Sequence, residues 1–343
     1  MSGSESVFLK AVRREPTPCT PIWLMRQAGR YLPEYRAMRA RHSFLELCRN
    51  PDAAAEVTLQ PVERLGVDAA ILFADILLLL EPLGVGLEFA KGEGPVIHRP
   101  VRTAADVARL APIDVDAAVP FVFETVRRAR RALAGRVPLI GFAGAPFTVA
   151  SYLVEGGASR EFLHTKRLMY DEPEAWHRLM DLLADATARY LNGQIAAGAE
   201  AVQLFDSWVG ALGPDDYRAY VLPHSRAVMK AVTGAPVIHF GTGTAALLPL
   251  MREAGGEVIG LDWRVDLDAG WRAVGLDVAV QGNLDPAVLL ASPAIIRERA
   301  RAVLERAAGR PGHVFNLGHG VHQATPVEHV KALVDIVHEL SAR

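Results

Sequence analysis

The chain is poor in cysteine, and this limits the kinds of site that it can build. Among its 343 residues there are only two cysteines, Cys19 and Cys48. Two thiols cannot form a disulfide framework, and they are too few for a four-cysteine zinc site. A reducing compartment is therefore favoured, and we expect a cytoplasmic protein without a metal site.

An excess of charge of one sign is missing too, and so are long apolar runs. Lys and Arg number 37 against 39 Asp and Glu, which gives a formal net charge of −2. Such a chain lacks the overall basic field that attracts nucleic acid. The apolar run Ile76–Leu80 stops at Glu81, far short of a membrane span, and residues 1–16 contain no apolar signal core. We expect a soluble protein that binds neither nucleic acid nor membrane.

A regular alternation of short apolar runs with helical stretches is what the sequence does contain. Runs rich in Val, Ile, Leu and Phe are typical of buried parallel strands joined by crossover helices. The expected strands are Pro21–Met25, Val67–Phe73, Val137–Phe142, Glu200–Phe205, Ala235–Phe240, Glu257–Leu261, Leu276–Gln281 and His313–Leu317. Eight such strands predict an α/β fold of the (β/α)8 TIM-barrel type, with residues 1–343 as a single domain. The alternative is an open, doubly wound sheet, but the glycine-rich phosphate loop expected after its first strand is missing.

Local signals predict a hairpin and several helix starts. Val85–Phe89 and Pro95–His98, around Gly92 and Gly94, are expected to form a β-hairpin after the second strand. A capping side chain stands before proline at Asn50-Pro51, Asp285-Pro286, Ser292-Pro293 and Thr325-Pro326. Thr325 also has Glu328 three residues later, which predicts a capping box.

Polar residues and glycines gather where the expected strands end. In a barrel, the chemistry takes place on the loops at the carboxyl ends of the strands. The candidates at these ends are Arg26 and Arg30 after the first strand, Asp75 after the second, Tyr152 beyond the third, Ser207 after the fourth and His319 after the eighth.

The two arginines and the aspartate suggest specific chemistry. Lysine occurs five times and arginine 32 times, so a single arginine is weak evidence by itself. Arg26 and Arg30 differ from Arg39, which suits a solvated helix face, because they flank Gly29 at a strand end. Planar guanidinium groups there can bind substrate carboxylates. Asp75 follows an apolar strand and is interpreted as facing N–H donors or positive charge on a ligand, with a helix cap or ion pair as the alternative.

Two long motifs carry a family resemblance. The segment Met25–Arg36 closely resembles the N-terminal signature of the uroporphyrinogen decarboxylase family. Residues 141–148, continuing through Tyr152–Gly157, look like the second signature of that family. Shorter matches occur at 73–77, 281–286 and 316–320, so the resemblance runs from about residue 8 to the C-terminus.

The resemblance implies an activity and a set of site residues. The family is a homodimeric (β/α)8 barrel that converts uroporphyrinogen III to coproporphyrinogen III, losing four carbon dioxide molecules without a metal or other cofactor. Carried over position by position, the substrate-contacting residues are Arg26, Gln27, Ala28, Gly29, Arg30, Asp75, Tyr152, Ser207 and His319, with Arg39 near the site. Of these, Arg26, Arg30, Asp75 and His319 are the expected catalytic residues.

These residues suit a decarboxylation in which the substrate serves as its own electron sink. No lysine stands at an expected strand end to form a Schiff base. Protonation of the pyrrole carbon beside an acetate gives a cationic ring that Asp75 can stabilise. His319 has a suitable pKa range for a proton donor, whereas an acid role for Arg26 stays open because guanidinium is a poor acid.

Two other functions remain open at this point. Corrinoid-dependent methyltransferases related to the family resemble zinc enzymes with a His-x-Cys pair. Here His239 is followed by Phe240 and Gly241, so glycine stands where the thiolate would be. A tetrapyrrole carrier with an inactive site is the second possibility, and a turnover assay separates it from an enzyme.

Overall fold

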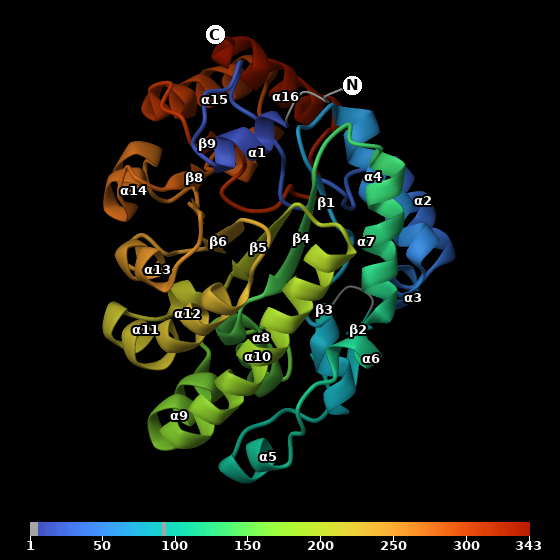
Figure 1. Ribbon diagram of the computed structural model, residues 1–343, viewed down its shortest axis with the longest axis vertical. Coiled ribbons are helices and arrows are strands. Elements are labelled where there is room, and N and C mark those ends of the chain that lie inside the picture. Colours follow the sequence, from blue (N-terminus) through green and yellow to red (C-terminus); the bar gives the residue numbers. More distant parts are fainter. Residues whose placement is uncertain (1–5, 91–93) are drawn as a thin grey trace.

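A curled parallel sheet lies at the centre of the molecule, with helices around its outside (Figure 1). The computed structural model describes residues 6–90 and 94–343. Seven strands pair in parallel in the order β1-β4-β5-β6-β7-β8-β9. They are β1 Ala70–Ile71, β4 Leu139–Gly144, β5 Ala201–Asp206, β6 Val237–Gly241, β7 Val258–Gly260, β8 Ala279–Gln281 and β9 His313–Val314. Each overlaps one expected strand, so seven of the eight expected strands are confirmed.

The first expected strand, Pro21–Met25, is not a regular strand. Ile22 forms an isolated parallel bridge with Phe315, just beyond β9. The Phe315 N–H donates to the Pro21 carbonyl at 2.8 Å, and the Asp68 N–H, just before β1, donates to the Ile22 carbonyl at 2.8 Å. The segment therefore hydrogen-bonds beside both edge strands of the sheet, although it is not itself a regular strand of it.

Helices lie before the first strand, between successive parallel strands, as crossover connections require, and after the last strand. They are α1 Val7–Val12, α2 Pro33–Arg41, α3 Phe44–Arg49, α4 Pro51–Leu65, α5 Ala104–Ala108, α6 Val115–Ala118, α7 Pro120–Leu133, α8 Pro146–Glu155, α9 Leu163–Asp171, α10 Pro173–Ala197, α11 Pro214–Tyr220, α12 Leu222–Ala231, α13 Leu248–Ala254, α14 Leu267–Val274, α15 Pro293–Ala307 and α16 Val327–Ser341. Short 3-10 helices are η1 Leu78–Leu83, η2 Val209–Ala211 and η3 Pro286–Leu290. Within the described part of the chain, no helix is long and apolar enough to cross a membrane.

Three of the four expected helix starts are confirmed. The Asn50 side chain accepts from the N–H groups of Asp52 and Ala53 and caps α4. Asp285 caps a 3-10 helix, η3, by accepting from the Ala287 N–H. Ser292 precedes α15 at the expected position but makes no side-chain capping bond.

The expected capping box at Thr325 is wrong. Helix α16 begins at Val327, so Pro326 occupies the cap position and Thr325 lies outside the helix. Thr325 is buried and its hydroxyl has no hydrogen-bond partner, while Glu328 pairs with Arg64 at 3.3 Å. Burial of the threonine thus withdraws the hydroxyl that the motif required.

The expected hairpin is present. Strands β2 Leu87–Ala90 and β3 Gly94–Ile97 pair antiparallel, and Gly92 lies outside the described residues. The hairpin is fixed to the end of α8, because Val96 bridges to Gly157 and the Ile97 N–H donates to the Gly156 carbonyl at 2.9 Å.

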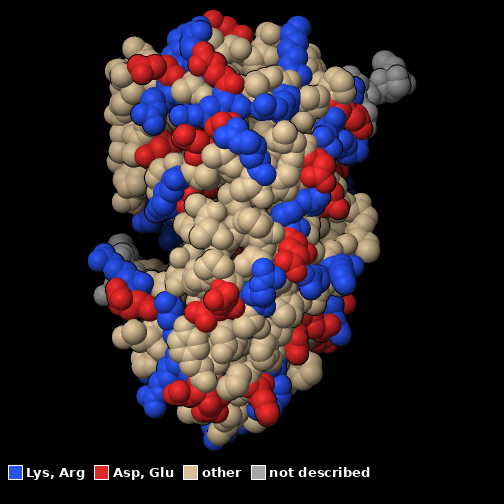
Figure 2. Space-filling model, turned by 90° about the vertical axis from the view of Figure 1, so that its left-hand side faces the viewer, with Lys and Arg blue, Asp and Glu red and all other residues tan. Residues whose placement is uncertain are grey.

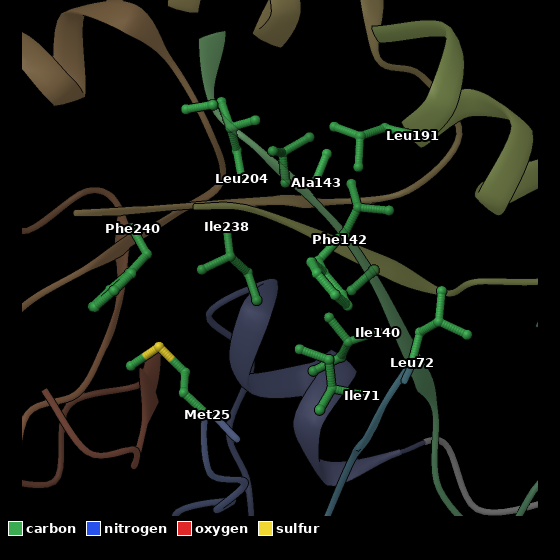
Figure 3. Packing of buried hydrophobic residues seen from close by; sticks show 14 of the residues in the cluster. Met25, Ile71, Leu72, Ile140, Phe142, Ala143, Leu191, Leu204, Ile238 and Phe240 are labelled. Atoms are coloured by element: carbon green, nitrogen blue, oxygen red, sulfur yellow. The ribbon is translucent and has the colours of Figure 1, made fainter. Parts of the chain in front are cut away.

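Side chains fill the inner face of the sheet. Figure 3 shows side chains that pack together here: Met25 from the first segment, Ile140 and Phe142 from β4, and Ile238 from β6. The centroid of the Phe205 ring lies 5.5 Å from that of Phe142 and 5.9 Å from that of Phe240. Beside this apolar packing, the Trp23 indole donates to Gln281 at 2.9 Å, and Gln281 donates to Gln203 at 3.0 Å. Because the interior is packed, a ligand site belongs at the strand ends.

On the outer surface, acidic and basic side chains are interspersed over the face drawn in Figure 2. They form many local ion pairs, such as those of Arg218 and Arg226 with Glu253. Exposed pairs of this kind contribute little to stability individually.

Candidate active site

Arg26 stands at the point where the first segment turns away from the sheet. Its φ of +60° is unusual for a residue other than glycine. The turn is fixed on both sides, because the Met25 N–H donates to Asn316 Oδ1 at 3.1 Å and the Val321 N–H donates to the Met25 carbonyl at 2.9 Å. A Cβ atom on Gly320 would lie 2.4 Å from Arg26 Cδ, so the arginine side chain passes directly against the loop after β9.

Gln27 and Gly29 shape this turn from within. Gln27 is buried; its Oε1 accepts from the Leu24 N–H at 3.0 Å and its Nε2 donates to the Ala69 carbonyl at 3.0 Å. A direct contact of this amide with substrate would require these bonds to be replaced. A Cβ on Gly29 would lie 2.8 Å from the Arg26 carbonyl oxygen, so glycine permits the tight turn. Ala28 lies between them, half-buried.

Asp75 lies in the loop after β1. One carboxylate oxygen accepts from the Leu77 N–H at 2.8 Å, which is a local turn bond of the kind aspartate often makes. Burial raises the pKa of Asp75 to about 6, while this bond and the charge of Arg26 act in the opposite direction. The carboxylate is therefore mostly ionised at pH 7 and lies within the electrostatic influence of Arg26.

Tyr152 extends from α8 toward the same region. Its ring stacks on Trp208, which follows β5, with centroids 3.7 Å apart and planes 27° apart. Burial and the nearby Asp75 raise the Tyr152 pKa to about 12, and Arg26 opposes the shift. Ser207 is half-buried beside Trp208, and its carbonyl accepts a hydrogen bond from the Thr242 hydroxyl. The phenol is neutral and lies in the fields of both Asp75 and Arg26.

His319 carries no charge near neutral pH. Burial lowers its pKa to about 4, and the positive charges of Arg26 and Arg264 act in the same direction, with Asp262 opposing. The pKa near neutrality that the sequence led us to expect is not found, because the pattern showed neither the burial nor the two cations. A neutral imidazole still offers one N–H donor and one acceptor.

Sequence reasoning did not select three residues after β7. The Trp263 ring meets His319 edge to face, with centroids 6.3 Å apart, and Arg264 stacks over Trp263. A Cβ on Gly318 would lie 2.2 Å from the Trp263 backbone nitrogen, so that glycine allows the two loops to touch. Asp262 and Trp263 were visible at an expected strand end, but nothing in the sequence paired them with the loop that carries His319.

The contacts of Arg30 and Arg39 are with residues outside this cluster. Arg30 is exposed ahead of α2, where its carbonyl accepts from Arg36 at 3.2 Å. Arg39 donates to the His42 carbonyl at 2.6 Å and lies over the Phe44 ring at 5.7 Å. Both charges act on Tyr35, so they border the region without joining the cluster of Arg26, Asp75, Tyr152 and His319.

The cluster brings one cation together with a carboxylate, a phenol and an imidazole from separate loops. Such a set can hold an anionic ligand through Arg26 while Asp75 faces positive charge or N–H donors. No group of three or more His, Cys, Asp or Glu within residues 6–90 and 94–343 is placed to hold a metal ion. His239, considered above as a zinc ligand, is fully buried.

A curled parallel sheet with its polar side chains gathered beyond the strand ends is typical of TIM-barrel-like α/β enzymes. The fold is similar to that of a methyltransferase from Methanosarcina mazei, with a TM-score of 0.78, 22% identity and 97% of each chain covered. The family model described as uroporphyrinogen decarboxylase (URO-D) matches residues 4–340, and the chain belongs to that family. Relatives named uroporphyrinogen decarboxylase include those of Carboxydothermus hydrogenoformans, 59% identical over 98% of this chain and 96% of the relative, and of Sorangium cellulosum, 59% identical over 97% and 96%.

Proposed function

We propose that this chain catalyses the decarboxylation of uroporphyrinogen III to coproporphyrinogen III, converting each of four acetate side chains to a methyl group. The name and high identity of the relatives support this activity. The structural observation that carries it is the position of Arg26, whose charge acts on Asp75, Tyr152 and His319 together. An anionic substrate with pyrrole N–H groups suits both charges of that cluster.

Asp75 is assigned to the pyrrole nitrogens. Protonation of the ring carbon beside an acetate produces a cationic ring, and the nearby carboxylate stabilises it. The bond between the methylene carbon and the carboxylate then breaks, carbon dioxide leaves, and the electron pair neutralises the ring. A second proton converts the exocyclic methylene to a methyl group as the ring carbon loses its proton. Electrostatic stabilisation in a partly buried site contributes several kcal/mol in such reactions.

Arg26 and Arg30 are assigned to substrate carboxylates, with Arg39 at the border of the site. His319 donates an N–H bond to a carboxylate, and the negative charge of the bound substrate raises its pKa toward the range of a proton donor. Tyr152 and Ser207 contact the macrocycle, whereas Gln27, Ala28 and Gly29 hold the turn that presents Arg26.

The same proposal covers the whole molecule. Residues 21–25 take the place of an eighth strand and close the sheet into a (β/α)8 barrel, residues 1–343 form one domain, and two chains form a homodimer. The protein is cytoplasmic, binds neither nucleic acid nor membrane, and needs no metal or prosthetic group.

The test is anaerobic incubation with uroporphyrinogen III, followed by oxidation and separation of the porphyrins by carboxylate number. We expect products with seven to four carboxylates, with equal rates in the presence and absence of a chelator. Loss of activity in chelator with recovery on adding zinc would contradict the proposal. Tight binding without turnover would instead indicate a tetrapyrrole carrier.

A further inference from the structure

The mechanism above makes no use of Arg264, which is held in an unusual way after β7. Its guanidinium stacks on the Trp263 ring, with Cζ 3.8 Å from the ring centroid. Its Nη1 donates to Asp262 Oδ2 at 2.7 Å, and its backbone N–H donates to Asp262 Oδ1 at 2.9 Å. One face and one edge of the guanidinium are therefore fixed.

Asp262 itself is held in place by hydrogen bonds from neighbouring loops. The carboxylate also accepts from the Gly243 N–H after β6, and Asn283 after β8 donates to the Asp262 carbonyl at 2.8 Å. The Asp262 side chain is 1% exposed, whereas the Arg264 side chain is 52% exposed. The loop therefore holds Arg264 in place at its backbone and at Nη1, while the other edge of its guanidinium group faces solvent.

This loop borders the candidate active site. Trp263 meets His319 edge to face, and Gly318 touches the Trp263 backbone. Arg26 passes against Gly320, next to His319, and Arg264 stacks on Trp263, whose ring meets His319, so both guanidinium groups lie near the same imidazole. Arg264 thus adds a second positive charge to the side of the site that lies beyond β7 and β9.

We propose that Arg264 is a further substrate-binding residue, which holds a carboxylate on a pyrrole ring other than the ring that faces Asp75. This inference rests on the proposed function. Asp75 follows β1 and Arg264 follows β7, four positions later in the sheet order, so we assign them to different pyrrole rings. The substrate carries carboxylates around its whole rim and can reach both. A stacked, tethered guanidinium loses little side-chain freedom on binding, and its planar edge matches a carboxylate.

The competing interpretation is that Arg264 only neutralises the buried Asp262. That interpretation predicts a loss of thermal stability for Arg264→Gln, full recovery of stability in Arg264→Lys, and unchanged ligand affinity in both. Substrate binding predicts weaker affinity in both variants, because lysine keeps the charge but lacks the two-pronged edge.

The experiment measures the Kd of uroporphyrin III, the oxidised and unreactive analogue with the same carboxylates, by fluorescence titration, and the KM for uroporphyrinogen III in parallel. For Arg264→Gln we expect Kd and KM to rise about tenfold, as for loss of one charged hydrogen-bonded pair, with kcat within about twofold. Arg264→Lys should fall between this variant and the wild type. The control is Arg272→Gln on α14, an exposed arginine paired with Asp268 at 2.9 Å, which should leave both constants unchanged.

An unchanged Kd in well-folded Arg264→Gln would overturn the assignment, whether or not its melting temperature falls. An equal rise in the Arg272→Gln control would also overturn it, because the effect would then be general electrostatic attraction. Failure of the wild type to turn over uroporphyrinogen counts against the proposed function, whereas the uroporphyrin titration still decides the role of Arg264.

Discussion

Two aspartates near strand ends, Asp75 and Asp206, differ in their surroundings more than in their pKa. Burial is the main cause in both cases, raising the pKa to about 6 for Asp75 and to about 7 for Asp206. Arg26 acts on Asp75, whereas Asp206 accepts hydrogen bonds from Thr148, whose hydroxyl oxygen lies 2.8 Å from Oδ1. A raised pKa therefore reports burial, and the neighbouring cation and access to a ligand are what mark a functional carboxylate.

Asp206 helps to hold Trp208 in position through Thr148. Thr148 donates to Asp206 and accepts from the Trp208 N–H at 3.2 Å. Trp208 in turn carries the stacked ring of Tyr152. In the proposed mechanism Asp75 faces the ligand, whereas Asp206 holds a loop in place.

The substitution Asp75→Asn is expected to have the largest effect on activity. The variant keeps the oxygen that accepts from Leu77 but removes the charge, so we expect kcat/KM to fall about a hundredfold or more. Stability should not fall. The pKa of Asp75 is higher in the folded state than in the unfolded state, so the wild type loses stability as the pH rises from the unfolded-state pKa through about 6. The variant has no carboxyl group to ionise, so it does not lose this stability at pH 7.5. Kinetics with thermal melts at that pH test both parts.

Asp75→Glu serves as the matched control. It keeps the charge but moves it by one methylene, so partial activity should survive. A well-folded Asp75→Asn protein with near-normal turnover would show that the carboxylate is a turn-forming group only.

Much of the fold was predictable because apolar periodicity marks strands that are buried on both faces. The exception was Pro21–Met25, where side-chain amides take the place of strand partners for Leu24 and Met25. Leu24 donates to Gln27 at 3.0 Å and Met25 donates to Asn316 at 3.1 Å. Hydrogen bonds between residues up to 291 positions apart produce no periodic pattern in the sequence.

The site was only partly predictable. Arg26, Asp75, Tyr152 and His319 were selected with the help of the family motifs, and the structure brings them together; their roles remain predictions. The pKa of His319 was not predictable, because it depends first on burial and then on Arg26 and Arg264 from two other loops. Gly318 and Gly320 flank His319 in the sequence, but only the fold shows that they make room for Trp263 and Arg26.

A smaller effect is expected from pH. Ionised Asp75 is the active form in the proposed mechanism, and kcat/KM reports the free protein. Because its pKa is about 6, kcat/KM should fall about tenfold per pH unit below that value and level off above it. The residual activity of Asp75→Asn should lack this limb. Persistence of the same limb in the variant would assign the titration to another group.

The smallest expected effect on activity is that of Asp206→Asn, and it completes the comparison. The variant keeps an oxygen that can accept the Thr148 hydroxyl, so Trp208 and Tyr152 should stay in place and kcat/KM should remain within about threefold of the wild type. Its effect should appear in stability instead. The folded pKa of Asp206 lies above the unfolded value of 3.8, so the native state holds the proton more tightly.

The contribution of Asp206 to the free energy of unfolding is therefore fully present below about pH 4. It is lost as the pH rises through about 7, and the loss amounts to up to about 4 kcal/mol. Urea unfolding at pH 5.5, 7.0 and 8.5 should show the wild type losing stability relative to Asp206→Asn as pH increases. If the variant instead loses activity as severely as Asp75→Asn while its melts stay normal, Asp206 takes part in the chemistry, and a cation-free buried carboxylate must then be counted among the functional ones.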